Sequence, residues 1–78
     1  MPTLLRIGKT RFFFYSNEGN EPPHTHVEQA GATAKFWLLP VPLANFRGFD
    51  FPALRKLQRQ VQRNQHRFLG AWHDHFSK

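Results

Sequence analysis

Short stretches of strand-forming residues occupy the first half of the chain, and turn-forming residues separate them. The clearest is 33–39, where Ala34, Phe36 and Leu38 alternate with positions expected on the opposite face of a sheet. The segment 40–42 carries two prolines, which cannot both lie in a hydrogen-bonded ladder, so the sheet is expected to end there. The predicted strands are 4–7, 11–15, 25–29 and 33–39.

The second half of the chain has the spacing of an amphipathic helix. Asp50 stands where an N-cap is expected, and Pro52 is tolerated in a first helical turn. The apolar positions that follow at helical spacing are Leu54, Leu57, Val61, Phe68, Trp72 and Phe76. Asn64 interrupts this stripe and favours a bend or break there. Residues 43–48, between sheet and helix, are expected to form a connecting loop or a single helical turn.

Strands followed by helices indicate an α+β fold rather than alternating α/β. We expect a small antiparallel sheet of three to four strands, followed by one long bent helix or two C-terminal helices packed on one face. A chain of 78 residues predicts a single domain, 1–78, with its sheet in 1–42 and its helical part in 50–76.

Composition narrows the class of protein. The chain has no cysteine, which excludes disulfide support, and no apolar run approaches the length of a membrane span. We therefore expect a soluble, cytoplasmic protein. The formal net charge is +6, which favours nucleic acid or an acidic protein as a partner.

Most candidate chemistry lies in one stretch, RFFFYSNEGNEPPHTHV, residues 11–27. A run of aromatic residues leads into a turn-rich loop that carries Glu18 and Glu21. The loop ends at His24 and His26, which share a face if the chain is extended.

Three interpretations of the histidine pair stay open. A metal site would need a third ligand, either Glu21 or one of His73 and His75, and those two cannot share an ion because they lie about 200° apart on a helix. Alternatively, both histidines are structural. In that case turn formation accounts for the composition of the loop, and hydrogen bonds to the backbone account for the two histidines.

The third interpretation is acid–base cleavage of RNA without a metal. It needs a base, an acid and a cation for the phosphate. His24, His26 and Glu21 could supply proton transfer, with Arg11 as the cation, and Lys35 or Arg47 could assist it. We expect no metal and no cofactor, and whether the protein is an enzyme stays open.

A row of arginines follows the predicted helix at a spacing of four residues. No Asp or Glu lies between Phe51 and His73 to pair with them, so phosphates, an acidic partner or plain hydration must compensate their repulsion. The row consists of Arg55, Arg59, Arg63 and Arg67.

Four segments, MPTLLRIG, RFFFYSNEGNEPPHTHVE, AKFWLLPV and AWHDHF, resemble a family of small bacterial proteins known mainly as a domain of unknown function. The resemblance covers nearly the whole chain, and the block 12–26 is highly specific to the family. It implies a gene beside that of a second small protein, as in toxin–antitoxin pairs. Family members carry several Glu in the helix, which this chain lacks, so the arginine row is specific to this protein.

The sequence thus predicts a toxin-like component of a bacterial two-gene module, acting on RNA or translation through the His24/His26 loop. Its expected partners are a small cognate protein encoded nearby and RNA. The alternative is a non-catalytic module that binds a protein or a nucleic acid.

Overall fold

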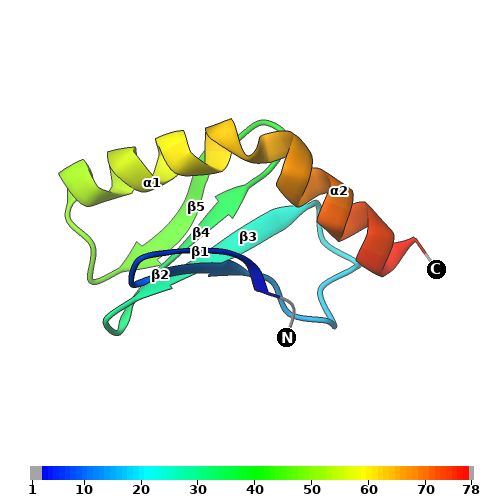
Figure 1. Cartoon of the computed structure of the whole chain (residues 1–78), viewed down its shortest axis with the longest axis horizontal. Coiled ribbons are helices and arrows are strands. Elements are labelled where there is room, and N and C mark those ends of the chain that lie inside the picture. Colours follow the sequence, from blue (N-terminus) through cyan, green and yellow to red (C-terminus); the bar gives the residue numbers. More distant parts are fainter. Residues whose placement is uncertain (1–2, 78) are drawn as a thin grey trace.

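The computed structural model describes residues 3–77, which form an antiparallel sheet followed by two helices (Figure 1). The sheet has five strands in the order β1-β2-β3-β4-β5, so each strand pairs with its neighbour in sequence. The strands are β1 (Thr3–Ile7), β2 (Thr10–Phe13), β3 (His24–Gln29), β4 (Ala32–Trp37) and β5 (Leu43–Arg47). The α+β class and the order of sheet before helices are confirmed.

The fifth strand corrects the expectation for residues 43–48. That segment is neither a loop nor a helical turn, because Leu43–Arg47 pairs with β4 along its length. The register shifts between Lys35 and Phe36, so the pairing contains an irregularity of the bulge type. The sheet therefore has one strand more than expected and extends beyond residue 42.

The helical part divides as predicted into α1 (Phe51–Arg63) and α2 (Gln65–Phe76). Asp50 caps α1, since its Oδ1 accepts a hydrogen bond from the Ala53 amide at 2.9 Å. Asn64 separates the helices, and its side chain donates to the Gln60 carbonyl at 2.8 Å. The polar residue in the apolar stripe thus marks a break. Neither helix within residues 3–77 has the length and apolar composition needed to cross a bilayer.

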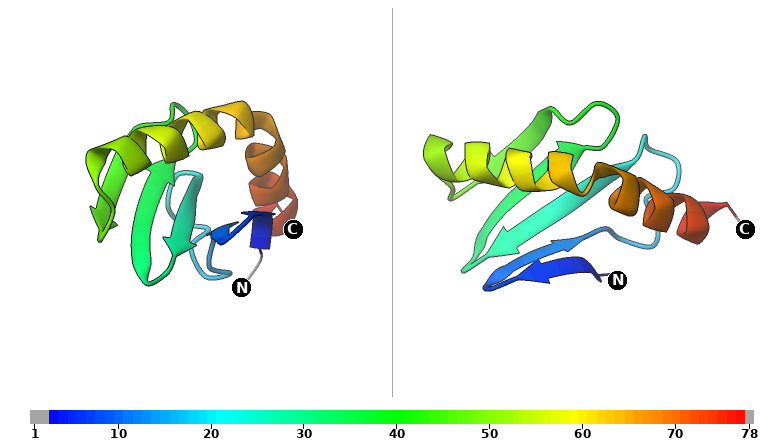
Figure 2. Two further views of the ribbon diagram at one scale, coloured as in Figure 1. Left: turned by 60° about the vertical axis from the view of Figure 1, so that its left-hand side comes forward. Right: turned by 45° about the horizontal axis from the view of Figure 1, so that its top comes forward.

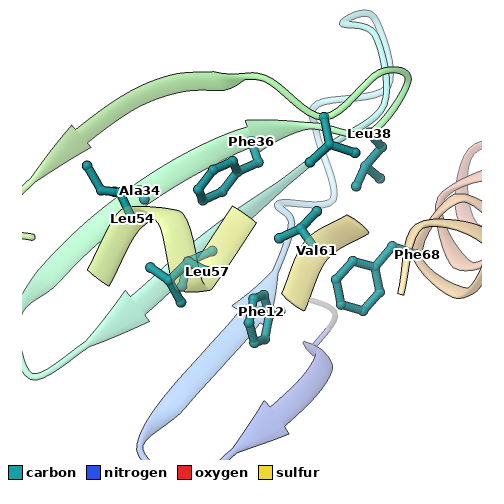
Figure 3. Packing of buried hydrophobic residues seen from close by; sticks show 10 residues of the cluster. Phe12, Ala34, Phe36, Leu38, Leu54, Leu57, Val61 and Phe68 are labelled. Carbon is teal, nitrogen blue, oxygen red and sulfur yellow. The ribbon is translucent and has the colours of Figure 1, made fainter. Parts of the chain in front are cut away.

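The core lies between the sheet and the helices (Figure 3). β4 contributes Ala34 and Phe36, which are almost fully buried, as the alternating pattern predicts. Leu54, Leu57 and Val61 of α1 face them, each 5% exposed or less. Burial of such side chains contributes about 1.5–3 kcal/mol each, so this layer is the main apolar contribution to the fold.

Both helices lie on the same side of the sheet, which leaves its other face free of helices (Figure 2). We call this second face the outer face. The strand register places Phe13, His26 and Lys35 side by side on it, and the row beside them contains Arg11 and Glu28. The loop between β2 and β3 lies at one end of the sheet, near α2 (Figure 1). The loop with Glu18 and Glu21, together with His24 and His26, therefore lies at that end of the sheet.

Candidate functional site

The loop between β2 and β3 folds back on itself directly after the aromatic strand. The Glu18 amide donates to the Tyr15 carbonyl at 3.3 Å, and the Tyr15 amide donates to Glu18 Oε1 at 2.8 Å. A second turn follows, in which the Glu21 amide donates to the Glu18 carbonyl at 3.1 Å. These bonds hold the Glu18 carboxylate against the start of β3.

Two histidine side chains converge on that carboxylate. His24 Nε2 lies 3.0 Å from Glu18 Oε1, and His26 Nε2 lies 2.9 Å from Oε2. The two rings are 5.1 Å apart between centroids and nearly perpendicular. We call Glu18, His24 and His26 the Glu–His–His cluster. The prediction that the histidines share a site-forming face is consistent with this arrangement.

The two histidines make different contacts with Glu18. His26 Nε2 donates a hydrogen bond to the carboxylate, and 21% of the His26 side chain is exposed. His24 is completely buried, and its Nδ1 donates to the Pro22 carbonyl at 3.0 Å. His24 Nε2 has no hydrogen-bond partner among the described residues, because its approach to Glu18 has the distance of a hydrogen bond without the alignment.

Aromatic rings pack against both histidines and shield the side of the cluster that faces the protein interior from water. His24 packs against Trp72 of α2 and Trp37 of β4, with centroids 4.8 Å and 5.7 Å away. His26 stacks on Phe13 at 5.5 Å and meets Tyr15 edge-on at 4.9 Å. Sheet and helix thus both fix the ring positions.

Opposing effects set the pKa of Glu18. Partial burial raises it, but hydrogen bonds from His26 and the Tyr15 amide, together with the nearby His24 imidazole, outweigh burial and hold the pKa of Glu18 below its ordinary value. The carboxylate is therefore ionised at neutral pH, which makes it a competent acceptor or ligand.

The end of α2 holds the loop in place. Phe14 packs against Trp72 and Phe76, with centroids 5.1 Å and 5.3 Å away. Gly19 lies so close to the Phe76 ring that a Cβ at Gly19 would stand 2.5 Å from a ring carbon. Only glycine permits this approach, so the glycine in the loop is explained by packing against the helix.

Glu21, the carboxylate predicted to assist the histidines, lies outside the cluster. Its Oε1 accepts a hydrogen bond from Lys35 Nζ at 2.8 Å, which lowers the pKa of Glu21. Lys35 also lies over the Trp37 ring, 4.6 Å from its centroid. Glu18, and not Glu21, is therefore the carboxylate that contacts the histidines, and Glu21 pairs with Lys35 beside the cluster.

Other predicted residues are dispersed. Arg11 lies over the Phe13 ring at 4.4 Å and donates to Thr3 Oγ1 at 3.1 Å, one row from His26 on the outer face. Among the described residues, the only group able to supply three metal ligands is the Glu–His–His cluster, so His73 and His75 do not join it. The His75 ring contacts Phe14 instead.

Comparison with known proteins adds the family. A model of a domain of unknown function, DUF4160, matches residues 10–73. The chain belongs to the DUF4160 family. No curated protein and no solved structure matches it.

The DUF4160 match contains the whole Glu–His–His cluster together with Trp72, which packs on it. Sequence reasoning missed Glu18 as the partner of the histidines. A signal for it exists: Glu18 is the fourth residue of a turn that starts at Tyr15, and such a turn returns the chain to its own strand. The contact between Trp72 and His24 has no comparable local signal.

The remaining basic residues of the DUF4160 domain lie on two different surfaces. Arg47 is exposed on β5 and pairs in register with Thr33, which places it in the Arg11 row of the outer face. The arginines of the helical row are all exposed, and none forms an ion pair within residues 3–77. They are Arg55, Arg59 and Arg63 of α1 and Arg67 of α2.

Two hollows of the surface lie away from the cluster. The larger, of about 370 Å³, is between the N-terminal hairpin and α2, and the smaller, of about 210 Å³, lies beside α1. Neither includes a residue of the Glu–His–His cluster.

Proposed function

We propose that this DUF4160 protein acts on RNA as the toxin-like component of a two-gene module. In this proposal the outer face of the sheet binds RNA and the Glu–His–His cluster is the reactive centre. The observation that carries the proposal is the surroundings of the cluster: two cations and several aromatic rings adjoin it, and His26 keeps an exposed edge on the side away from α2.

The chemistry of this face matches that of single-stranded RNA. Lys35 lies beside His26 in the sheet and Arg11 lies one row away, so both can contact phosphates, although Lys35 must first exchange its ion pair with Glu21 for a phosphate. Tyr15, which is 43% exposed, offers a ring on which an unpaired base can stack. The net charge of +6 acts in the same direction.

The geometry supports unequal roles for the cluster residues. Acid–base cleavage by two histidines needs them on opposite sides of a phosphate, whereas here both Nε2 atoms face one carboxylate. His26 is the histidine that keeps an exposed edge and can touch RNA. His24 is buried and acts as a positioning residue for Glu18.

Induced expression in bacteria tests the proposal. We expect wild-type protein to arrest growth and to produce RNA fragments with defined ends. His26→Gln and Glu18→Gln should abolish both effects while remaining soluble. His73→Gln, at an exposed histidine outside the cluster, is the matched control and should behave as wild type. Co-expression of the neighbouring gene should relieve the arrest.

Two results would contradict this reading. Growth arrest that persists in soluble, folded His26→Gln and Glu18→Gln would remove catalysis by the cluster. Growth arrest that produces no RNA fragments, and that disappears only in the double variant Arg11→Gln/Lys35→Gln, would indicate that the protein binds RNA without cleaving it.

A second candidate, a non-catalytic protein-binding module, is favoured by one apolar patch. Phe46 of the edge strand β5 is 43% exposed and Phe51 at the start of α1 is 66% exposed, with ring centroids 6.2 Å apart. An edge strand beside exposed rings is a place where a partner can add. Co-purification of the neighbouring protein, lost with Phe46→Ser and Phe51→Ser, would support this role.

A further inference from the structure

We infer that Glu18, His24 and His26 together bind one divalent transition-metal ion of the Zn²⁺ type. This deepens the proposed function by naming a cofactor for its reactive centre. The inference rests on the ligand geometry alone, so it stands even if the protein does not act on RNA. It replaces the expectation, drawn from the sequence, that no metal is bound.

The three ligand atoms are already at nearly the separation that an ion requires. Each residue offers one nitrogen or oxygen, and all of these atoms lie within 4.8 Å of one another, with His24 Nε2 and His26 Nε2 at 3.0 Å and 2.9 Å from Glu18 oxygens. A tetrahedral ion with bonds of about 2.0–2.2 Å separates its ligands by about 3.3–3.6 Å. The separations between Glu18 and the histidines would widen by a few tenths of an ångström, and the two Nε2 atoms, at most 4.8 Å apart, would approach each other by up to about 1.2 Å.

The buried His24 ring gives an independent argument. A carbonyl can only accept, so Nδ1 must donate to Pro22, and in the neutral ring Nε2 then carries a lone pair. Nε2 faces an ionised carboxylate oxygen at 3.0 Å with no hydrogen-bond partner, in a side chain with no exposed surface. Such an arrangement is costly unless a cation, either a proton on Nε2 or a metal ion, lies between the two atoms.

The surroundings are those expected around metal ligands. A ligating histidine commonly donates its other nitrogen to a backbone carbonyl, as His24 does to Pro22. The Glu18 carboxylate is likewise held by the Tyr15 amide. Trp37 and Trp72 exclude water behind His24, while His26 and Glu18 keep 21% and 14% exposure on the other side.

Two histidines and one carboxylate are a ligand set found in catalytic zinc sites, where a further position stays open for water or substrate. The same set also serves Fe²⁺, so the identity of the ion is decided by measurement. The exposed side of the cluster, beside His26, is where the open position would lie.

Binding is tested with Zn²⁺ alone on untagged protein that has been stripped with a chelator. In competition with a chromophoric chelator, we expect one Zn²⁺ per chain. Glu18→Gln and His26→Gln should each weaken binding by at least about a hundredfold, the upper end of the effect of losing a mere supporting group. The double variant His73→Gln/His75→Gln removes another H-x-H pair outside the cluster, and it should retain wild-type affinity.

A measurement on the wild type decides the matter if the cluster variants fail to fold. Both tryptophans of the chain contact the His24 ring, so Cu²⁺ at the cluster should quench their fluorescence strongly. Because Cu²⁺ binds such ligands more tightly than Zn²⁺, only a large excess of Zn²⁺ should displace Cu²⁺ and restore the signal.

The inference is overturned by the absence of stoichiometric binding, or by binding that disappears in His73→Gln/His75→Gln and persists in Glu18→Gln. Because no RNA is present in these titrations, their failure leaves the RNA proposal untouched. Conversely, a wild-type protein that binds Zn²⁺ but does not arrest growth would contradict the RNA proposal and leave the metal site unaffected.

Discussion

At the scale of single residues, the position of a carboxylate in a turn decides what it contacts. Glu18 and Glu21 are three residues apart in the same loop, yet Glu18 meets both histidines and Glu21 meets Lys35. The turn that begins at Tyr15 directs Glu18 back to the sheet. Composition and spacing do not separate two such residues, because their difference lies in the backbone path of the loop.

The lowered pKa of Glu18 predicts how stability depends on pH. A group whose pKa is lower in the folded state than its ordinary value of 4.5 stabilises the fold above that value. The contribution is lost as the pH falls through the lower, folded-state pKa. The free energy of unfolding should therefore decrease below about pH 4.5, at no more than about 1.4 kcal/mol per pH unit for this one proton.

Urea unfolding at several pH values, in the presence of a chelator, measures this effect. Glu18→Gln should show a shallower loss of stability in acid than wild type. Glu21→Gln reports the separate contribution of the carboxylate beside Lys35, whose pKa is also lowered. Identical pH profiles for wild type and Glu18→Gln would show that the Glu18 contacts do not favour its ionised form.

At the scale of elements, the segments with strong periodicity could be predicted and a weak one could not. The aromatic run and the alternation around Phe36 predicted β2 and β4, although both strands end before the predicted residue. The break at Asn64 followed from one polar residue in an apolar stripe. The strand β5 was missed because LANFR lacks β-branched residues and follows two prolines, so only pairing with β4 makes it a strand.

The same distinction applies to the candidate site. Local spacing was enough to place His24 and His26 together, because neighbouring positions of an extended chain are involved. The burial of His24 depends on Trp72, which is 48 positions away in the chain (72 − 24). Contacts of that kind follow from how α2 crosses the end of the sheet, and no local pattern encodes them.

The contact between helices and sheet predicts which substitutions destabilise the domain. Leu54→Ala and Trp72→Ala should each lower the free energy of unfolding by about 2–5 kcal/mol, because each leaves a cavity in a buried layer. Chemical denaturation measures both. Phe51→Ala is a matched control on α1, since that ring is 66% exposed and its loss should cost about 0.5 kcal/mol or less. Losses below about 1 kcal/mol for Leu54→Ala would contradict the described packing.

At the scale of the whole molecule, basic charge lies on two opposite surfaces. The outer face carries Arg11 and Lys35, whereas Arg59 and Arg63 of α1 point away from the core on the helical side. The domain measures 37 × 22 × 21 Å along its principal axes. Its thickness is about twice the screening length of about 10 Å at 0.1 M salt. A strand bound to one of these surfaces would therefore be largely screened from the charges of the other.

The salt dependence of RNA binding distinguishes these surfaces. Each contact between a cation and a phosphate of a single strand adds about 0.7 to the slope of log affinity against log salt. If RNA lies on the outer face, Arg11→Gln with Lys35→Gln should reduce the slope by about 1.4. Arg59→Gln with Arg63→Gln should leave it nearly unchanged and should stabilise α1 slightly, because the repulsion between like charges is relieved.

Fluorescence titration with a single-stranded RNA at several salt concentrations gives these slopes, and both double variants preserve side-chain size closely enough to keep the fold. The reverse pattern, a loss of about 1.4 only in the Arg59/Arg63 variant, would move the RNA site to the helical row and separate it from the Glu–His–His cluster. Cleavage at the cluster would then be excluded for RNA bound there, because the bound strand would lie on the helical side of the domain, whereas His26 lies on the outer face of the sheet.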